Sequence, residues 1–324
     1  MKVFVTKPIP DIGIHLMQDQ GIDVTIWDQD RPLMQQELIE ITKQHSALLS
    51  VGPNRLDANF LKECRHLKVI ALYSVGYDHI DVEAAVQSTI PVANTPNVLS
   101  DATTDIAFIL MLAVSRKAFY MHKQIINGAW NSNRSTKANL GIELKNKTLG
   151  ILGLGRIGQE MAKRCKGAYN MNILYCNRAA NMVAEEELQA TKVSFAELLQ
   201  RSDVLSVHCS LTAETKGVFD LAAFKKMKPS AIFINTARGQ IHQEQDLIKA
   251  LQDGIIWGAG LDVTNPEPMK PDNPLLFMPN VAVLPHIGSA TVEARNAMAR
   301  LAAENIICGL KGERLPNIVN PEVY

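Results

Sequence analysis

Three closely spaced glycines, Gly153, Gly155 and Gly158, constrain the fold of this chain more than any other feature. They stand between an apolar segment typical of a β-strand, TLGIL, and an amphipathic segment typical of a helix, RIGQEMAKRCK. In that context the spacing G-x-G-x-x-G indicates a turn that holds a dinucleotide. We expect Gly153 to allow the tight turn, Gly155 to let the backbone approach a pyrophosphate, and Gly158 to let the helix pack on the sheet. The alternative is a strand-to-helix turn that needs glycine only for its own backbone.

The residues after the turn indicate which dinucleotide fits. The helix start offers N–H groups to phosphate oxygens, here from Arg156 and Ile157. An NAD site usually has an acidic residue about 20 positions on, at the end of the next strand. Here that strand ends in Asn177 and Arg178, and an arginine at this place accommodates a 2′-phosphate. We therefore expect NADP(H), with NAD(H) as the alternative if Arg178 is only a solvated surface charge.

Strand and helix patterns alternate on both sides of the turn and predict an α/β protein with parallel sheets. The chain has 324 residues, which is more than one hydrophobic core of about 250–300 residues supports, so two domains are expected. The expected strands lie at 2–6, 23–27, 47–50, 68–74, 148–153, 172–176, 203–209, 231–236, 258–263 and 281–286. We expect two doubly wound parallel-sheet domains: a Rossmann cofactor domain at 99–287, inserted into a flavodoxin-like substrate domain made of 1–98 and 288–324.

Helix ends also leave signals in the sequence. Ser100 is a suitable N-cap for a long helix over 100–127, which Gly128 would close, and residues 90–99 before it are expected to form a loop. Ser194 and Glu197 have the spacing of a capping box at the start of another helix. The periodicity over 291–309 predicts a final helix.

Charge, apolar runs and cysteine usage exclude several classes of protein. Lys plus Arg and Asp plus Glu both number 33, so nothing favours nucleic acid or an anionic membrane as partner. The longest apolar run, Ile106–Val114, is too short to span a bilayer, which needs about 20 residues. The five cysteines form no C-x-x-C pair, so we expect free thiols, no metal site and a cytoplasmic location.

Three residues suited to reducing a ketone follow predicted strand ends, where open α/β sheets bind ligands: Arg238, Glu267 and His286. A guanidinium binds a carboxylate with two parallel hydrogen bonds and does not deprotonate. An imidazole gives and takes a proton near neutral pH. A carboxylate beside that imidazole would favour its protonated form. Each residue alone also has a structural interpretation: a strand cap, a turn acid and a core histidine.

The segments TLGILGLGRIG, INTARGQ, GAGLDVTNPEP and LPHIGSAT occur in this order along the chain. Together they resemble the D-isomer-specific 2-hydroxyacid dehydrogenases, and most closely the glyoxylate/hydroxypyruvate reductase branch. The resemblance covers nearly the whole chain. It implies that Arg238 binds the substrate carboxylate, that His286 is the acid–base and that Glu267 assists His286.

The resemblance also implies the remaining site residues and the assembly. The amides of Val75 and Gly76 would bind the substrate carboxylate with Arg238, and Ser289 would lie at the mouth of the site. Further cofactor contacts would come from Thr104, His208, Cys209, Thr236, Ala237, Asp262, His286 and Gly288. A homodimer is implied, in which Trp130 either lies at the contact or packs after the long helix.

The expected function is therefore the NADPH-dependent reduction of a small 2-keto acid, such as glyoxylate or hydroxypyruvate, to the D-2-hydroxy acid. Two alternatives stay open. One is a 2-ketogluconate-type sugar-acid reductase, with the same machinery and a roomier pocket. The other is a non-catalytic, nucleotide-sensing protein like the co-repressors built on this fold.

Overall fold

The computed structural model describes residues 1–52, 54–130 and 139–324, and these form two compact units. The first unit consists of Met1–Leu99 and Ser289–Tyr324, and the second of Ser100–Gly288. The two domain boundaries expected from the sequence, after residues 98 and 287, each lie one residue before those in the structure, after residues 99 and 288. No helix among the described residues is long and apolar enough to cross a membrane.

The first unit contains a five-stranded parallel sheet in the order β2-β1-β3-β4-β5. Its strands are β1 (Lys2–Val5), β2 (Asp23–Ile26), β3 (Ala47–Ser50), β4 (Val69–Leu72) and β5 (Val92–Ala93). Its helices are α1 (Asp11–Gln18), α2 (Gln35–Thr42), α3 (Ala58–Glu63), α4 (Val82–Gln87) and α12 (Val292–Lys311), with a 3₁₀ turn η4 (Pro321–Val323). This is the flavodoxin-like strand order, with a reversal between β1 and β3.

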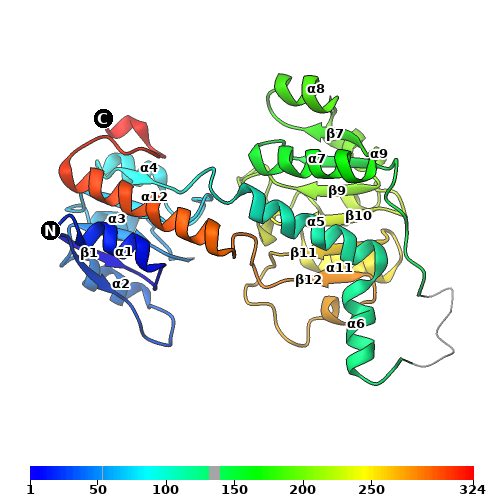
Figure 1. The fold of residues 1–324 in the computed structure, drawn as a ribbon, viewed down its shortest axis with the longest axis horizontal. Coiled ribbons are helices and arrows are strands. Elements are labelled where there is room, and N and C mark those ends of the chain that lie inside the picture. The colour runs from blue at the N-terminus through cyan, green and yellow to red at the C-terminus, as the bar shows by residue number, and fades with distance from the viewer. Residues whose placement is uncertain (53, 131–138) are drawn as a thin grey trace. The chain divides into compact units, whose positions relative to one another are not determined.

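Helices cover both faces of this sheet. Helices α1 and α12 pack side by side, although they stand at opposite ends of the chain (Figure 1). Helices α2, α3 and α4 pack on the other face, where Phe4, Leu48 and Ile70 of the strands meet Leu38 and Phe60 of the helices. Because both faces are covered, the central strands β3 and β4 are buried along their whole length, whereas the edge strand β2 alternates between more and less exposed residues.

The second unit contains a seven-stranded parallel sheet in the order β12-β11-β10-β9-β6-β7-β8. Its strands are β6 (Thr148–Leu152), β7 (Asn172–Cys176), β8 (Thr191–Lys192), β9 (Val204–Val207), β10 (Ile232–Asn235), β11 (Gly258–Leu261) and β12 (Val281–Val283). Counted from β6, this is the Rossmann order with one more strand at the edge.

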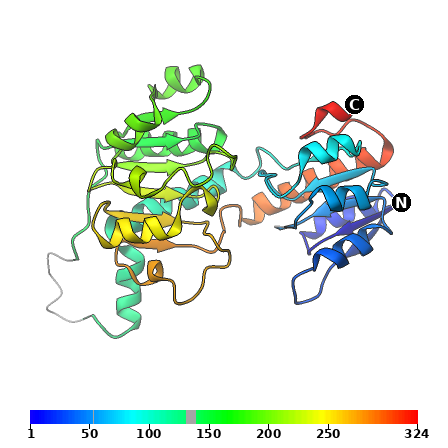
Figure 2. The same ribbon diagram turned by 180° about the vertical axis from the view of Figure 1, so that it is seen from behind.

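Helices again cover the two faces. The helices of this unit are α5 (Ser100–Arg116), α6 (Ala118–Ile126), α7 (Arg156–Tyr169), α8 (Met182–Leu188), α9 (Phe195–Arg201), α10 (Leu221–Phe224) and α11 (Glu244–Gln252), with 3₁₀ turns η2 (Gly239–Ile241) and η3 (Pro274–Phe277). All of them except α6 bury residues against the rest of the unit. Helices α5 and α7 pack together on one face (Figure 1). The yellow helix α11 lies in front of the opposite face when the unit is seen from behind (Figure 2). The two ends of the second unit lie together, since a Cβ on Gly288 would be 3.3 Å from Thr103 Cγ2.

Most expected elements are present, and the α/β fold with two parallel sheets is confirmed. The capping box is also confirmed: the Ser194 hydroxyl accepts the Glu197 amide, and the Glu197 carboxylate accepts the Ser194 amide. The final helix extends from Val292 to Lys311 and is capped by Thr291. The loop expected over 90–99 contains the short strand β5, and Ser100 is the first helical residue rather than the cap.

The continuous helix expected over 100–127 is wrong. Lys117 adopts a left-handed conformation with φ +54°, and it separates α5 from α6. The Ser115 carbonyl, which a continuous helix would bond to residue 119, instead accepts the amide of Ile142 at 2.8 Å. Gly141 packs so tightly against Ser115 that a Cβ there would lie 2.3 Å from the carbonyl oxygen. The break therefore comes from a contact with a distant segment.

Candidate active site and dinucleotide turn

The three glycines of the turn each meet a different environment. Gly153 follows β6 with φ +96°, and a Cβ there would lie 2.5 Å from the backbone nitrogen of Cys209. A Cβ on Gly158 would lie 2.6 Å from the carbonyl oxygen of Gly153. Nothing lies within 4 Å of the Cβ position of Gly155. Two glycines are therefore required by packing within the protein, whereas the third faces open space.

That open space adjoins the start of α7. Gly155 is the N-cap residue, and no side chain caps the helix. The first N–H groups of a helix have no partner within it, and the helix dipole is positive there. Arg156, the first helical residue, is exposed. The donors, the open approach at Gly155 and the strand–turn–helix context together fit the pyrophosphate of a dinucleotide.

Two asparagine side chains hold the backbone of the glycine turn. The Asn177 side chain accepts the amide of Leu154 at 2.7 Å. The Asn181 side chain donates to the carbonyl of Leu154 at 3.0 Å. Asn177, expected to touch the cofactor, is thus held to the backbone of the turn itself.

Two cations lie where the acidic residue of an NAD site would stand. Arg178 is exposed just after β7, and its carbonyl accepts a hydrogen bond from Lys192 Nζ at 3.2 Å. Lys192 ends β8, the neighbouring edge strand. The sequence did not indicate Lys192, because a two-residue strand of threonine and lysine carries no apolar pattern.

His208 follows β9 and is held by hydroxyl groups. Its Nε2 lies 2.8 Å from Ser206 Oγ, and its Nδ1 lies 3.4 Å from Thr236 Oγ1. Burial lowers the pKa of His208 to about 4, so the imidazole is neutral at pH 7. Burial also raises the pKa of its neighbour Cys209 to about 11, which keeps the thiol protonated. Neither group can supply a proton by titrating near neutral pH.

Asn235, at the end of β10, holds the loop that carries Arg238. Its side-chain oxygen accepts the amide of Ala237 at 3.0 Å, and its nitrogen donates to the carbonyl of Arg238 at 2.9 Å. The Asn235 amide also lies 3.1 Å from Nδ1 of His242, whose pKa burial lowers to about 4. Arg238 Nη1 donates to the carbonyl of Ala237 at 2.7 Å. Asn235 lies within the motif INTARGQ, but its bonding was not inferred from the sequence.

His286 and Glu267 form a pair, with Nδ1 of the imidazole 3.0 Å from Oε2 of the carboxylate. The other carboxylate oxygen accepts the amide of Thr264 at 2.9 Å. Burial acts to raise the pKa of Glu267, but the hydrogen bonds from His286 and Thr264, together with the charge of Arg238, outweigh burial and leave the pKa below its ordinary value. An ionised carboxylate only accepts, so Nδ1 carries the proton and Nε2 of His286 faces away from Glu267.

Asp262 holds the backbone on which His286 lies. This buried residue directly follows β11 and accepts two amides, from Ile287 at 2.8 Å and from Gly288 at 2.7 Å. His286 itself has φ +55°, a conformation that is costly for a non-glycine residue and needs support from its surroundings. Burial raises the pKa of Asp262, and the two amide bonds oppose that rise.

A run of backbone amides lies in the first unit, after β4. The carbonyl of Val75 accepts from Asn94 Nδ2 at 2.8 Å, and that of Gly76 accepts from Ser74 Oγ at 2.7 Å. Among the described residues, the N–H groups of Ser74, Val75 and Gly76 have no acceptor. Successive amides whose carbonyls are already bonded suit an anionic ligand such as a carboxylate.

Three further residues were expected at the site. Thr104 is fully buried, and its hydroxyl bonds to the carbonyls of Ser100 at 2.7 Å and Ile157 at 3.3 Å. Ser289 is the first residue after the chain re-enters the first unit. Trp130 is 75 % exposed and so is not packed in a core, and the loop positions 131–134 after it lie outside the described residues.

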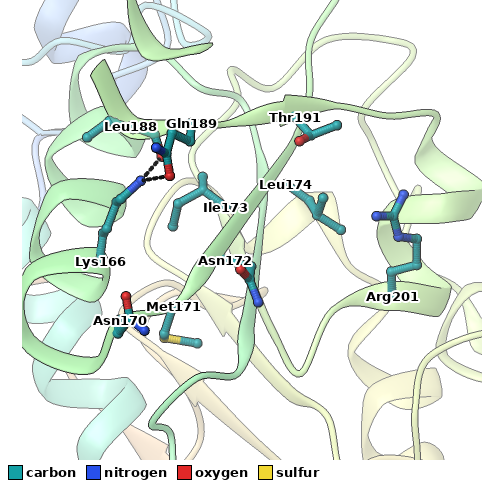
Figure 3. A pocket seen from close by; sticks show the side chains of 10 residues that line it. All are labelled: Lys166, Asn170, Met171, Asn172, Ile173, Leu174, Leu188, Gln189, Thr191 and Arg201. Carbon is teal, nitrogen blue, oxygen red and sulfur yellow. Dashed lines mark hydrogen bonds between the residues drawn. The ribbon is translucent and has the colours of Figure 1, made fainter. Parts of the chain in front are cut away.

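A pocket of the second unit lies away from these groups, at the amino end of β7 (Figure 3). Its volume is about 250 Å³. The Lys166 ammonium there donates to the carbonyl of Leu188 at 2.6 Å and to the side chain of Gln189 at 3.1 Å, so two of its three N–H donors already have partners. Parallel α/β sheets bind ligands at the carboxyl ends of their strands, so this pocket is not the candidate site. No group of three or more His, Cys, Asp or Glu residues in the described part of the chain can hold a metal ion.

Comparison with known proteins agrees with this geometry. Residues 108–288 match the family model for the D-isomer specific 2-hydroxyacid dehydrogenase, NAD binding domain. A glyoxylate reductase of Thermococcus litoralis is 44% identical, over 99% of this chain and 97% of that protein.

Solved structures give the same result. A Thermus thermophilus protein superposes with a TM-score of 0.90 at 38% identity, covering 98% of this chain and 100% of that one. An NADPH-dependent glyoxylate/hydroxypyruvate reductase of Sinorhizobium meliloti, in complex with NADP and malonate, superposes with a TM-score of 0.86 at 29% identity, covering 99% and 97% of the two chains. The chain therefore belongs to the D-isomer specific 2-hydroxyacid dehydrogenases, a family of NAD(P)-dependent oxidoreductases.

Proposed function

We propose that this protein reduces a small 2-keto acid, such as glyoxylate or hydroxypyruvate, to the D-2-hydroxy acid and that NADPH is its coenzyme. The observation that carries the proposal is the 3.0 Å pair of His286 and Glu267, in the same unit as the dinucleotide turn. Relatives named glyoxylate reductase, 44% and 43% identical over the whole chain, support the substrate class.

In the proposed reaction, Arg238 and the amides of Val75 and Gly76 bind the substrate carboxylate. A reduced nicotinamide coenzyme, held at the turn of Gly153, Gly155 and Gly158, would supply the hydride for the keto carbon. As negative charge builds on the keto oxygen, Nε2 of His286 gives it a proton. Because the pKa of Glu267 is held below its ordinary value, its carboxylate stays ionised near neutral pH, accepts the Nδ1 proton of His286 and leaves Nε2 for the substrate. His208, neutral at pH 7, positions neighbouring groups through its two hydroxyl partners.

The proposal is tested by measuring kcat/KM for a panel of 2-keto acids with both NADPH and NADH. Turnover of glyoxylate or hydroxypyruvate, faster with NADPH, is expected. Faster turnover with NADH would remove the assignment of the coenzyme but not that of the reaction. NADPH binding without turnover of any 2-keto acid would instead make the protein a nucleotide sensor.

The preference for NADPH rests on Arg178 and Lys192, whose positions suit a 2′-phosphate. The S. meliloti relative was solved with NADP. Replacing either residue with glutamine removes one charged contact, so KM for NADPH is expected to rise about tenfold, which corresponds to about 1.4 kcal/mol. KM for NADH, which lacks that phosphate, should change less than twofold.

Steady-state kinetics with the two coenzymes measure this difference. Arg201→Gln is the matched control, because Arg201 is an exposed cation of the same unit on α9. An equal loss with NADPH and NADH in the Arg178 and Lys192 variants would contradict the assignment.

We also propose that the protein is a homodimer. Helix α6 buries none of its residues, and it exposes Phe119, Ile125 and Ile126. Ile126 is 70 % exposed, and a partner subunit would remove this apolar surface from water. Ile126→Glu is therefore expected to shift the mass measured by light scattering from dimer to monomer, without loss of the folded state. Val292→Glu, an equally exposed position of the first unit, should stay dimeric. An unchanged mass in both variants would remove α6 from the interface.

The cytoplasm is the proposed location, because all five cysteines are free thiols, as expected in a reducing compartment.

A further inference from the structure

The first unit carries a lysine at the point in its sheet where open α/β folds receive a ligand. In the order β2-β1-β3-β4-β5, strand β2 lies on one side of β1, whereas β3, β4 and β5 follow on the other side. The direction in which strands are added to the sheet therefore reverses between β1 and β3. Ligands bind at such a reversal, beyond the carboxyl ends of the two strands. Lys7 follows β1 and Gly52 follows β3, so both lie at this place.

The strand register places these residues next to the amides of Val75 and Gly76. Val5 of β1 pairs with Leu49 of β3, and Ser50 of β3 pairs with Leu72 of β4. Two or three residues beyond these pairs, the three strands have all ended. Lys7, Gly52 and the segment Ser74–Gly76 therefore lie beyond the carboxyl ends of three neighbouring strands.

The Lys7 side chain reaches from β1 over the end of β3. A Cβ built on Gly52 would lie 3.5 Å from Lys7 Nζ and 3.8 Å from Lys7 Cε, with no other atom within 4 Å. Gly52 has φ +85°, so a residue with a side chain would be strained there. Lys7 is exposed, and it makes no ion pair or hydrogen bond with the residues that the structure describes. The other described lysine of β1 and its flanks, Lys2, lies at the amino end and pairs with Asp23 at 3.9 Å.

The backbone on which Lys7 stands is fixed. The hydroxyl of Thr6 accepts the amide of Val51 at 2.8 Å and also bonds to its carbonyl at 3.2 Å. Asn54 donates to the same hydroxyl at 2.8 Å. Thr6 is buried, so these bonds are shielded from water. The position from which the ammonium extends is therefore set by the fold, not by a mobile loop.

The spacing decides what this cation can reach. Neighbouring strands lie about 4.8 Å apart. The Lys7 ammonium lies beside Gly52, beyond the end of β3, and the amides of Val75 and Gly76 follow β4, the neighbouring strand. With its 1-carboxylate on those amides, a three- to five-carbon keto acid is long enough to bridge neighbouring strand ends, so its far end is what an ammonium beside them would recognise.

We propose that Lys7 recognises a second anionic group at the far end of the substrate, so that the preferred substrates are 2-keto acids with a distal carboxylate or phosphate. This inference rests on the proposed function, since it assumes that the amides of Val75 and Gly76 bind the 1-carboxylate. It narrows the substrate class, because glyoxylate has no distal group and gains nothing from Lys7.

Kinetics with substrates of different distal charge test the inference. We would measure kcat/KM for glyoxylate and hydroxypyruvate, which lack a distal charge, and for oxaloacetate, 2-oxoglutarate and phosphohydroxypyruvate, which carry one. Lys7→Gln is expected to lower kcat/KM for the charged substrates about tenfold, mainly through KM, and to change the value for glyoxylate less than twofold. Lys7→Arg should restore most of the loss, and added salt should weaken the preference of the unsubstituted protein. The arms with carboxylate and phosphate substrates identify which anion is bound better.

Lys2→Gln, at the other end of the same strand, is the matched control and should change no substrate selectively. Equal effects of Lys7→Gln on glyoxylate and on the charged substrates, or no effect on either, would overturn the inference while glyoxylate turnover still supports the proposed function. If no 2-keto acid is reduced at all, the proposed function itself fails.

Discussion

Replacing His286 with alanine is expected to lower kcat for keto-acid reduction by about 10²–10⁴-fold, the usual contribution of a positioned acid–base group. That range corresponds to about 3–5 kcal/mol of transition-state stabilisation. Nε2 of His286 faces away from Glu267, and among the histidines of this site His208 is neutral at pH 7 because burial lowers its pKa to about 4. No neighbouring histidine can therefore replace the lost proton donor. Stopped-flow measurement of NADPH oxidation in a single turnover would report the chemical step directly.

His122→Gln is the matched control, because His122 is an exposed histidine of the same unit. NADPH binding, followed by fluorescence titration, should change far less than kcat in the alanine variant, since His286 is only one of many expected contacts with the coenzyme. Turnover that survives His286→Ala would show that another group supplies the proton.

Gly155→Ala is expected to weaken NADPH binding about 100-fold and to leave the apo-protein as stable as before. A Cβ at this position meets no protein atom within 4 Å, so the folded chain accepts it. The added methyl group would occupy the space through which the pyrophosphate reaches the start of α7. Losing one or two charge-assisted hydrogen bonds, worth about 1.5–3 kcal/mol each, accounts for that change in Kd.

Gly158→Ala should behave in the opposite way. Its Cβ would lie 2.6 Å from the backbone oxygen of Gly153, so the turn must shift, and the apo-protein should lose about 1–3 kcal/mol of stability. Gly167→Ala is the control, since Gly167 lies on the same helix with nothing within 4 Å, and it should gain up to about 1 kcal/mol of stability from helix propensity alone. Calorimetry without coenzyme and fluorescence titration with it separate the two effects. Unchanged NADPH affinity in Gly155→Ala would mean that the dinucleotide does not bind at this turn.

Strands and caps could be predicted because their causes are local. Buried parallel strands such as β4 and β9 are short apolar runs, and the capping box at Ser194 needs only two residues three positions apart. The break at Lys117 could not be predicted in this way, because it depends on the amide of Ile142 and the close approach of Gly141. Strands β5 and β8 have two residues each, too few for any periodicity to show.

The same division holds for the site. Arg238, Glu267 and His286 stand in recognisable motifs at strand ends, so they could be selected from the sequence. Lys192 could not, because only the pairing of β7 with β8 brings it to Arg178. The resemblance likewise implied a coenzyme contact for Asp262 without revealing that both its oxygens hold the backbone after His286. Residues that act by supporting others are visible only once the chain is folded.

The adjacent ends of the second unit, where Gly288 approaches Thr103, make that unit a cassette. A segment whose termini meet can be transplanted between host proteins without stretching the scaffold that receives it. The coenzyme choice proposed for Arg178 and Lys192 within the cassette, and the substrate choice proposed for Lys7 in the scaffold, would then be free to diverge independently during evolution or to be recombined in chimaeric enzymes.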